Sequence, residues 1–280
     1  MKGRFMRHGI CKLCLKEAGL LDSHYLPKRA YSMNMARSLK NPNPVTLAHG
    51  QAKQVSDQLR GHTFCAECED RLSKKGEKWV LANIPKDYKS TFPLQDALIP
   101  ESPTHIAAKI NVYAGRKINA FDIDKLVYLG MSVFWRGAAR EWRSSTGAAA
   151  PPVDLGEFFE PIRQYLLGGP FPEDVFIVVM IHTLKPVGNA ALPVHHATDQ
   201  HGDFYWFYLN GLGFKLYLGK ATPLAIRGLC ASHPDGPVVV DSGFGEMVYR
   251  FIKDQLNSSV KAENLVTFLD GYKQDKSPQS

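Results

Sequence analysis

Four of the five cysteines fall into two Cys-x-x-Cys pairs near the start of the chain, Cys11 with Cys14 and Cys65 with Cys68. Two intervening residues let a tight turn aim both sulfurs at one ion, and two such pairs complete the tetrahedral thiolate site that Zn²⁺ prefers. Two disulfides, or four cysteines with no joint role, are the alternatives. Paired cysteines in a reducing compartment are more often metal ligands than disulfides, so we expect a structural zinc ion.

His24 lies between the two pairs, three residues before Pro27, and Glu69 and Glu77 follow the second pair. His24 has a ring whose ordinary pKa of about 6.5 suits a general base near neutral pH. Glu69 and Glu77 are eight residues apart, on roughly one face of a helix, and they are the other candidate catalytic residues. Glu69 and Asp22 offer the oxygen ligands that Mg²⁺ or Mn²⁺ prefers, and such a cation beside a base is what phosphodiester hydrolysis needs. The alternatives are a helix N-terminal charge for Glu69 and a solvent-exposed charge for Glu77.

Basic charge is concentrated in the same part of the chain as the cysteines. Residues 1–90 contain 17 lysines and arginines against 8 acidic residues, whereas the other 190 residues contain 17 against 19. A basic surface beside a metal site favours a polyanionic partner, with DNA ahead of RNA, although a solubilising face would have the same composition. The candidate phosphate contacts are Lys28, Arg29, Arg71, Lys74 and Lys75.

Length and hydropathy are those of an ordinary globular protein. The 280 residues are 44% hydrophobic and 22% charged, which is enough apolar material to bury a core. No apolar run approaches the ~18 residues that a membrane-spanning helix needs, and the N-terminus lacks a signal-peptide core. We therefore expect a cytoplasmic protein without a membrane partner. A homo-oligomer or a regulatory partner would bind through the second half of the chain.

Hydrophobic periodicity and turn residues divide the chain into two parts. The first part is predicted to contain a strand at 19–27, a helix at 28–39, a loop at 41–44, a hairpin or loop at 44–61 and a helix from 69 to about 83. The second part is predicted to contain helices at 122–142, 155–167, 245–256 and 262–269, and strands at 174–182, 204–208, 214–218 and 238–240. Segment 106–113 fits either a helix or a strand.

This order of elements predicts an α+β fold with two domains. We expect a small domain at 1–90, and an α+β domain of unknown role at 104–272 whose mostly antiparallel sheet carries helices on one side. A disordered tail is expected at 273–280.

The motifs of the first part resemble the HNH endonuclease family, which has the ββα-metal fold. The resemblance covers residues 8–84 and lies in Cys11–Cys14, Ser23-His24 with Pro27, Cys65–Cys68 with Glu69, Ser73 and Glu77. It is closest to an uncharacterised bacterial branch of that family, in which Ser-His-x-x-Pro and Cys-x-x-Cys-Glu signatures precede a separate C-terminal region. Phe134-Trp135-Arg136 is similar to part of that region.

The resemblance implies a zinc-stapled N-terminal ββα-metal domain with His24 as general base. Two positions depart from the family pattern. Typical members carry a metal-binding acid before the histidine, where this chain has Ser23. They carry His or Asn after the second cysteine pair, where this chain has Glu69. A carboxylate binds Mg²⁺ as well as an imidazole does, so the resemblance makes Glu69 the replacement ligand.

Three functions follow as hypotheses. The first is a metal-dependent endonuclease, a hydrolase of phosphodiester bonds, for which the family alone implies a role in bacterial defence or as a toxin. The second is a non-catalytic zinc protein that binds nucleic acid, with Ser23 marking a degenerate site. The third is an interaction protein whose activity lies in residues 104–272.

Overall fold

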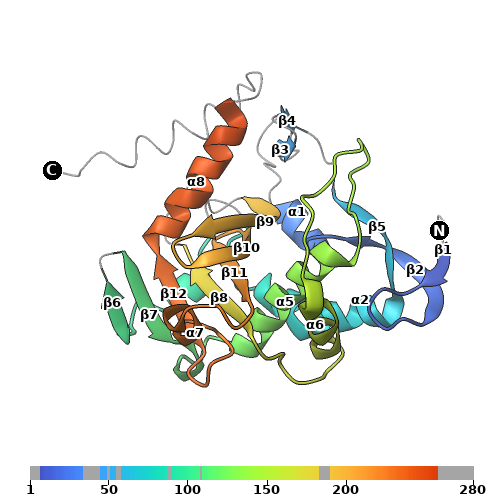
Figure 1. Cartoon of the computed structure of the whole chain (residues 1–280). Coiled ribbons are helices and arrows are strands. Elements are labelled where there is room, and N and C mark those ends of the chain that lie inside the picture. The colour runs from blue at the N-terminus through green and yellow to red at the C-terminus, as the bar shows by residue number, and fades with distance from the viewer. Residues whose placement is uncertain are drawn as a thin grey trace.

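The computed structural model describes residues 7–33, 45–48, 51–54, 58–86, 90–107, 109–182 and 190–257. The predictions for the end of the 28–39 helix, the loop at 41–44, the 262–269 helix and the tail at 273–280 lie outside these residues. The fold is mixed α+β, as the sequence predicts. Figure 1 shows a small N-terminal sheet at one side of the molecule and a larger sheet at the other, with the long helix α5 between the strands of both.

The N-terminal sheet has the antiparallel order β1-β2-β5. It consists of β1 (Arg7–Ile10), β2 (Glu17–His24) and β5 (Arg60–Cys65), and β2 confirms the strand predicted at 19–27. Between β2 and β5 lie α1 (Lys28–Met33) and a hairpin of β3 (Val45–Ala48) and β4 (Gln51–Gln54). Because β2 and β5 are antiparallel, the turn before β2 and the end of β5 are neighbours, and each carries one cysteine pair.

A continuous helical segment follows β5 and contains one π-helical turn. It consists of α2 (Ala66–Leu72), the π-helical turn Ser73–Glu77 and α3 (Lys78–Val80). The helix begins before the predicted start at Glu69, because Cys65 has the extended backbone of an N-cap and Cys68 already lies in the first turn. A Cβ on Gly76 would approach the backbone nitrogen of Leu129 to 2.9 Å. The glycine therefore lets this segment pack closely against the backbone of α5.

The larger sheet has seven strands within the described residues, in the order β6-β7-β12-β8-β11-β10-β9. Its neighbouring strands are antiparallel except for β12 and β8, which are parallel, so the prediction of a mostly antiparallel sheet is confirmed. The strands are β6 (His105–Ala107), β7 (Ile110–Ala114), β8 (Val175–Ile181), β9 (Ala191–Asp199), β10 (Gly202–Leu209), β11 (Leu212–Leu218) and β12 (Pro237–Asp241).

Three of these strands, β6, β7 and β9, go beyond what the hydrophobic pattern of the sequence predicts. The ambiguous segment 106–113 forms the β6–β7 hairpin. Strand β9 has no counterpart in the prediction, because its histidines and small residues carry little hydrophobic alternation.

Helices cover both faces of the larger sheet, which corrects the expectation of helices on one side. Along β8, Ile177 and Val179 belong to the core beneath α5 (Ile123–Ala139). The alternate residues Val178 and Met180 belong to a second cluster that includes Val248 of α8 (Ser242–Asn257). The other helices are α4 (Pro93–Asp96), α6 (Phe159–Leu166) and α7 (Leu224–Gly228), with 3₁₀ turns at Gly115–Lys117 and Gly156–Phe158.

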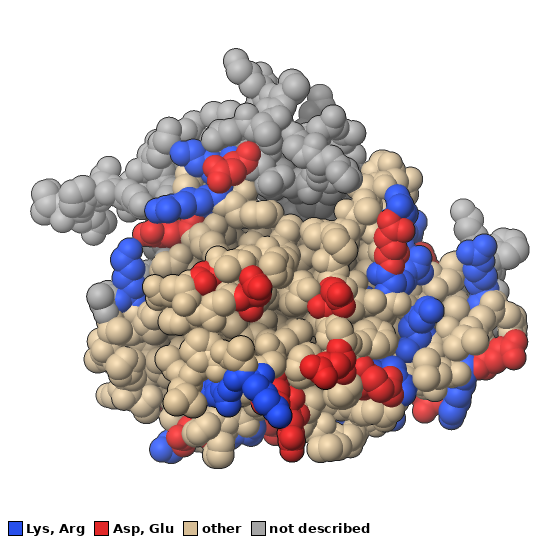
Figure 2. Space-filling model, in the orientation of Figure 1, with Lys and Arg blue, Asp and Glu red and all other residues tan. Residues whose placement is uncertain are grey.

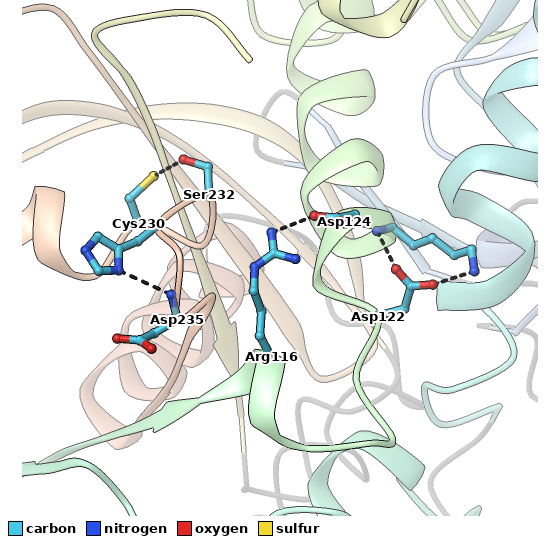
Figure 3. A network of polar contacts seen from close by, with 8 residues as sticks. Arg116, Asp122, Asp124, Cys230, Ser232 and Asp235 are labelled. Atoms are coloured by element: carbon cyan, nitrogen blue, oxygen red, sulfur yellow. Dashed lines mark hydrogen bonds and ion pairs between the residues drawn. The ribbon is translucent and has the colours of Figure 1, made fainter. Parts of the chain in front are cut away.

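Charged side chains fix the start of α5 (Figure 3). The Asp122 carboxylate caps the helix by accepting from the backbone nitrogen of Lys125 at 3.1 Å and from its Nζ at 2.5 Å. Arg116 donates to Oδ1 of Asp124 at 2.6 Å. A hollow of about 360 Å³ lies beside this end of the helix. Because these charged groups are paired with one another, we assign them the role of anchoring the helix.

One hydrophobic core joins the two parts of the chain. Neighbouring residues of α5 contact different sheets. Phe134 lies against Phe207 of β10 with ring centroids 5.0 Å apart, and Trp135 lies against Phe64 of β5 at 6.0 Å. Buried residues of both parts form a single contiguous cluster. The division into 1–90 and 104–272 stays a prediction, and α5 is the element that both parts share.

Candidate metal centre

The four N-terminal cysteines converge on one point. All four sulfur atoms lie within 4.8 Å of one another, and those of Cys14 and Cys65 are 3.8 Å apart. A tetrahedral Zn²⁺ with Zn–S bonds of about 2.3 Å holds its sulfurs roughly 3.8 Å apart, so the donor set fits zinc. All four thiols are free rather than joined in disulfides. The group can therefore hold a metal ion such as zinc.

The turn that contains Cys11 and Cys14 and the first turn of α2 orient these four sulfur atoms. The backbone nitrogen of Leu15 donates to the Cys11 carbonyl at 2.9 Å and closes the first turn, while the nitrogen of Cys65 donates to the Cys11 sulfur at 3.3 Å. The hydrogen bond between the Cys68 and Cys11 side chains lowers the pKa of Cys11 to about 4 and raises the pKa of Cys68. Cys11 is therefore already favoured as the thiolate, which is the form that binds a metal.

The second part of the chain holds the first cysteine turn in place. Arg163 of α6 is 6% exposed, and its Nη1 donates to the Leu13 carbonyl at 2.5 Å. The same guanidinium forms an ion pair with Glu160 at 2.6 Å. From the other side, Arg71 of α2 donates to the Leu167 carbonyl at 3.2 Å. These contacts link the cysteine framework to α6.

Ser23 is the residue of β2 that faces α2. It is 2% exposed, and its Oγ accepts from the backbone nitrogen of Phe64 at 3.3 Å and donates to the Leu21 carbonyl at 3.3 Å. Its hydroxyl also lies near enough to Glu69 to lower the pKa of that carboxyl. Because side chains alternate along a strand, Asp22 and His24 project from the opposite face of β2.

A buried ion cluster lies between α5 and the helical segment that follows β5. Arg136 of α5 is 2% exposed and forms an ion pair with Glu77, which is 15% exposed. Its Nη1 donates to the Tyr25 carbonyl at 3.3 Å, and its guanidinium lies 5.8 Å from the Phe64 ring centroid. Burial opposes the charge of Arg136, but Glu77 and Glu69 outweigh burial and raise the arginine's pKa. Burial raises the pKa of Glu69, and Arg136 acts in the opposite direction. The two predicted acids therefore share one arginine.

His24 has a different set of neighbours. Its ring centroid is 6.1 Å from that of Tyr31. Burial lowers the pKa of His24 most, with Asp22 raising it and Lys28 and Arg60 lowering it. Asp22 is itself paired with Arg60 at 3.2 Å, and both of these side chains are exposed. The catalytic role of His24 and the metal-binding role of Asp22 stay predictions.

Some of the predicted phosphate contacts are already engaged in ion pairs or hydrogen bonds, and others are not. Lys74 forms an ion pair with Asp70 at 2.7 Å, and Arg71 is engaged with α6. The others are exposed and have no ion pair within the described residues: Lys28, Arg29 and Lys75. On the face shown in Figure 2, basic and acidic side chains alternate at the right, where Figure 1 places β1, β2 and β5, while the middle of the face is mostly uncharged with a few acids.

Three arginines of the second part hold the first part, and none of them is among the predicted site residues. Besides Arg136 and Arg163, Arg140 donates through Nη1 to the His62 carbonyl at 3.2 Å. For Arg136 the sequence does carry a signal, because this residue lies three positions after Val133 on the apolar face of a predicted helix. A charge at such a position needs a buried partner. Arg140 and Arg163 have no comparable signal.

Comparisons with known proteins supply no relative. No family model, no curated protein and no solved structure matches the chain. Among the helices of the described residues, none is both long enough and apolar enough to span a bilayer. The functional argument therefore depends on the chemistry of the site.

Proposed function

We propose that this protein is a zinc-containing nucleic-acid-binding protein in which an internal ion cluster takes the place of an HNH-type hydrolytic centre. The observation that carries the proposal is the buried pairing of Arg136 with Glu77, beside Glu69. In the nuclease family that the sequence resembles, the residue before the histidine holds the catalytic ion together with the residue after the second cysteine pair. Here those positions are Ser23 and Glu69, and a guanidinium supplies the positive charge next to them.

Two carboxylates and one guanidinium give the cluster a formal charge of −1, but the position of Arg136 disfavours a divalent ion on Glu69. Arg136 is held by Glu77 and by the Tyr25 carbonyl, and it is almost fully buried. A divalent ion on Glu69 would lie close to this fixed positive charge, and like charges repel strongly where water is excluded. We therefore assign Glu69 and Glu77 the role of balancing Arg136 rather than of holding Mg²⁺ or Mn²⁺.

The zinc ion would be structural. Cys11, Cys14, Cys65 and Cys68 supply four protein ligands, which leaves no open position for water or substrate. A bound ion would cross-link the turn before β2 to the start of α2 and so contribute directly to the stability of the N-terminal sheet.

The basic charge of the same part of the chain indicates the partner. Its excess of lysine and arginine includes Lys28, Arg29 and Lys75 on α1 and after α2, which are exposed and form no ion pair with any residue that the structure describes. Exposed cations attract the phosphates of nucleic acid and release its counterions, so the resulting affinity falls steeply with salt. A rigid, zinc-linked basic unit is suited to binding nucleic acid without cutting it.

The test measures binding and cleavage with the same full-length protein. We expect anisotropy of a fluorescein-labelled 20-base-pair DNA to report binding that weakens from 50 to 200 mM salt. We expect Lys28→Glu with Arg29→Glu to reduce the slope of log K against log salt by about 2, because two phosphate contacts are lost. Lys220→Glu with Lys253→Glu, two exposed lysines of the second part, is the matched control. Salt-independent binding, or equal effects of both charge reversals, would contradict the proposal.

A second candidate is the endonuclease, and one observation favours it. His24 lies at the end of β2, and burial lowers its pKa, so the ring is neutral near pH 7 and able to accept a proton. Nicking of supercoiled plasmid with Mg²⁺ or Mn²⁺ separates the candidates. The binding proposal expects no divalent-dependent nicking. Nicking that disappears in His24→Ala and Glu69→Gln, but persists in the His201→Ala control, would replace it with the endonuclease.

A further inference from the structure

The first cysteine turn contains a residue whose backbone conformation is unfavourable for its side chain. Leu15 has φ of +61°, in the left-handed region where a Cβ crowds the following carbonyl and where glycine is the usual residue. Its side chain is 55% exposed, so the conformation brings little burial in return. The Leu15 backbone closes the cysteine turn, whereas its exposed side chain adds little packing to the fold and is free to contact a ligand.

A second exposed apolar side chain lies at the other end of the same turn. Ile10, directly before Cys11, is 61% exposed. It pairs in register with Glu17, and the Cys11 nitrogen donates to the Lys16 carbonyl at 2.9 Å, so residues 10 and 15 flank one tight turn. Five large hydrophobic side chains are exposed among the described residues, and two of them are found here. We call Ile10, Lys12, Leu15 and Lys16 the knuckle tip.

The knuckle tip is presented on a rigid base. Leu13, in the middle of the turn, is fully buried, and its carbonyl accepts from Arg163. The Lys12 nitrogen donates to the Thr63 carbonyl of β5 at 3.1 Å. A surface that is already ordered loses little conformational entropy when it binds, which favours recognition by preformed contacts.

The charges of the knuckle tip select the partner. Lys12 and Lys16 are exposed and have no ion pair in the part of the chain that the structure describes. Residues 7–17 contain one acidic residue, Glu17, and three basic residues, Arg7, Lys12 and Lys16. The complementary surface is apolar with negative charges on its flanks. Nucleic-acid bases between phosphates have this chemistry, and a tip this narrow and rigid lacks the long amphipathic face that a lipid surface binds.

We propose that the knuckle tip contacts bases of the bound nucleic acid, with Ile10 and Leu15 against the bases and the two lysines on the flanking phosphates. This inference rests on the nucleic-acid-binding function proposed above and adds the surface that performs it. It also explains why a leucine occupies a position that favours glycine.

The test uses Leu15→Gly in the full-length, zinc-loaded protein. Glycine removes the side chain and relieves the left-handed strain, so we expect the variant to melt at the same temperature as wild type or higher. We expect its affinity for a labelled single-stranded 20-mer to fall roughly tenfold, the value of burying one leucine. Ile10→Ser should act in the same direction. Leu224→Ser, an exposed leucine of α7, is the matched control and should bind as wild type does.

The outcomes separate this inference from the function on which it rests. Salt-dependent binding by wild type that is unchanged in Leu15→Gly and Ile10→Ser would overturn the inference alone. Loss of affinity that follows a loss of thermal stability in both variants would also overturn it. A wild-type protein that binds anionic vesicles but no nucleic acid would overturn both proposals. The affinities of wild type and Leu15→Gly for duplex DNA are measured in parallel. They show whether the knuckle tip contacts unpaired bases or the edges of bases in a groove.

Discussion

Acidification should loosen α8, because two histidine rings lie beneath this helix. His182 is 3% exposed, and neither of its ring nitrogens has a hydrogen-bond partner in the described part of the chain. A Cβ on Gly245 would come within 1.6 Å of its Cε1 atom, so the ring lies directly against the helix backbone. His195 of β9 has its ring centroid 4.5 Å from that of Phe251, on the next turns of α8, and 5.2 Å from Trp206.

The size of the effect follows from the pKa values. Burial lowers the pKa of both His182 and His195 to about 4, against an ordinary value of about 6.5. Between these two pH values the unfolded chain binds protons that the folded chain does not, so stability falls as the pH falls. Near pH 5 the slope is about 1.2 kcal/mol per pH unit for His182, and the loss reaches about 3 kcal/mol below pH 4. His195 is only partly buried and contributes less.

The assay is urea unfolding from pH 7 to pH 4.5, followed by tryptophan fluorescence. We expect His182→Leu and His195→Leu each to flatten the dependence of the unfolding free energy on pH, whatever they do to stability at pH 7. The measured quantity is the slope of the unfolding free energy against pH. If leucine does not fit at position 182, His195→Leu still provides the test. His105→Gln, an exposed histidine of β6, is the control. Equal slopes in wild type, the control and both leucine variants would refute the reasoning.

Three further changes test the packing around the metal centre. Arg136→Met leaves Glu77 without its partner, so we expect a loss of about 3–5 kcal/mol in the free energy of unfolding, and Glu77→Gln in the same chain should restore much of it. Gly76→Ala places a methyl against the α5 backbone, and we expect a loss of about 1–3 kcal/mol, measured by urea unfolding. Zinc chelation should lower the melting temperature, and Cys68→Ser protein should show the same decrease without chelator, with about one zinc per chain in wild type by elemental analysis.

Each of these expectations has a result that contradicts it. Arg136→Met protein as stable as wild type would mean that the ion pair adds nothing to the fold. A neutral Gly76→Ala would mean that α5 shifts to admit the methyl group. If the protein is purified without zinc and has the same melting temperature, the prediction of a structural zinc ion is wrong.

Local patterns in the sequence were sufficient for much of the fold. The Cys-x-x-Cys pairs predict a joint metal site because two intervening residues restrict where both sulfurs point. The apolar run 174–182 predicts β8, and the aromatic alternation around Asn210 predicts the β10–β11 hairpin, since a period of two needs only neighbouring residues. The periodic apolar face of 122–142 predicts α5, although the helix ends at Ala139.

Other features depend on contacts that no local pattern encodes. The sequence places His24, Glu69 and Glu77 within one motif, but only the folded chain shows that Ser23 of β2 lies next to Glu69. Strand β9 is held by pairing with β10 rather than by its own hydrophobicity.

By itself, the sequence determined the cysteine framework, the basic character of the first 90 residues and the main helices and strands, because each of these depends on residue type and short-range spacing. The tertiary structure decided that Arg136, 59 residues beyond Glu77, pairs with Glu77 and lies near Glu69. It did so because a buried charge is stable only next to its counter-charge, and the packing of α5 between the two sheets determines which acids that charge meets.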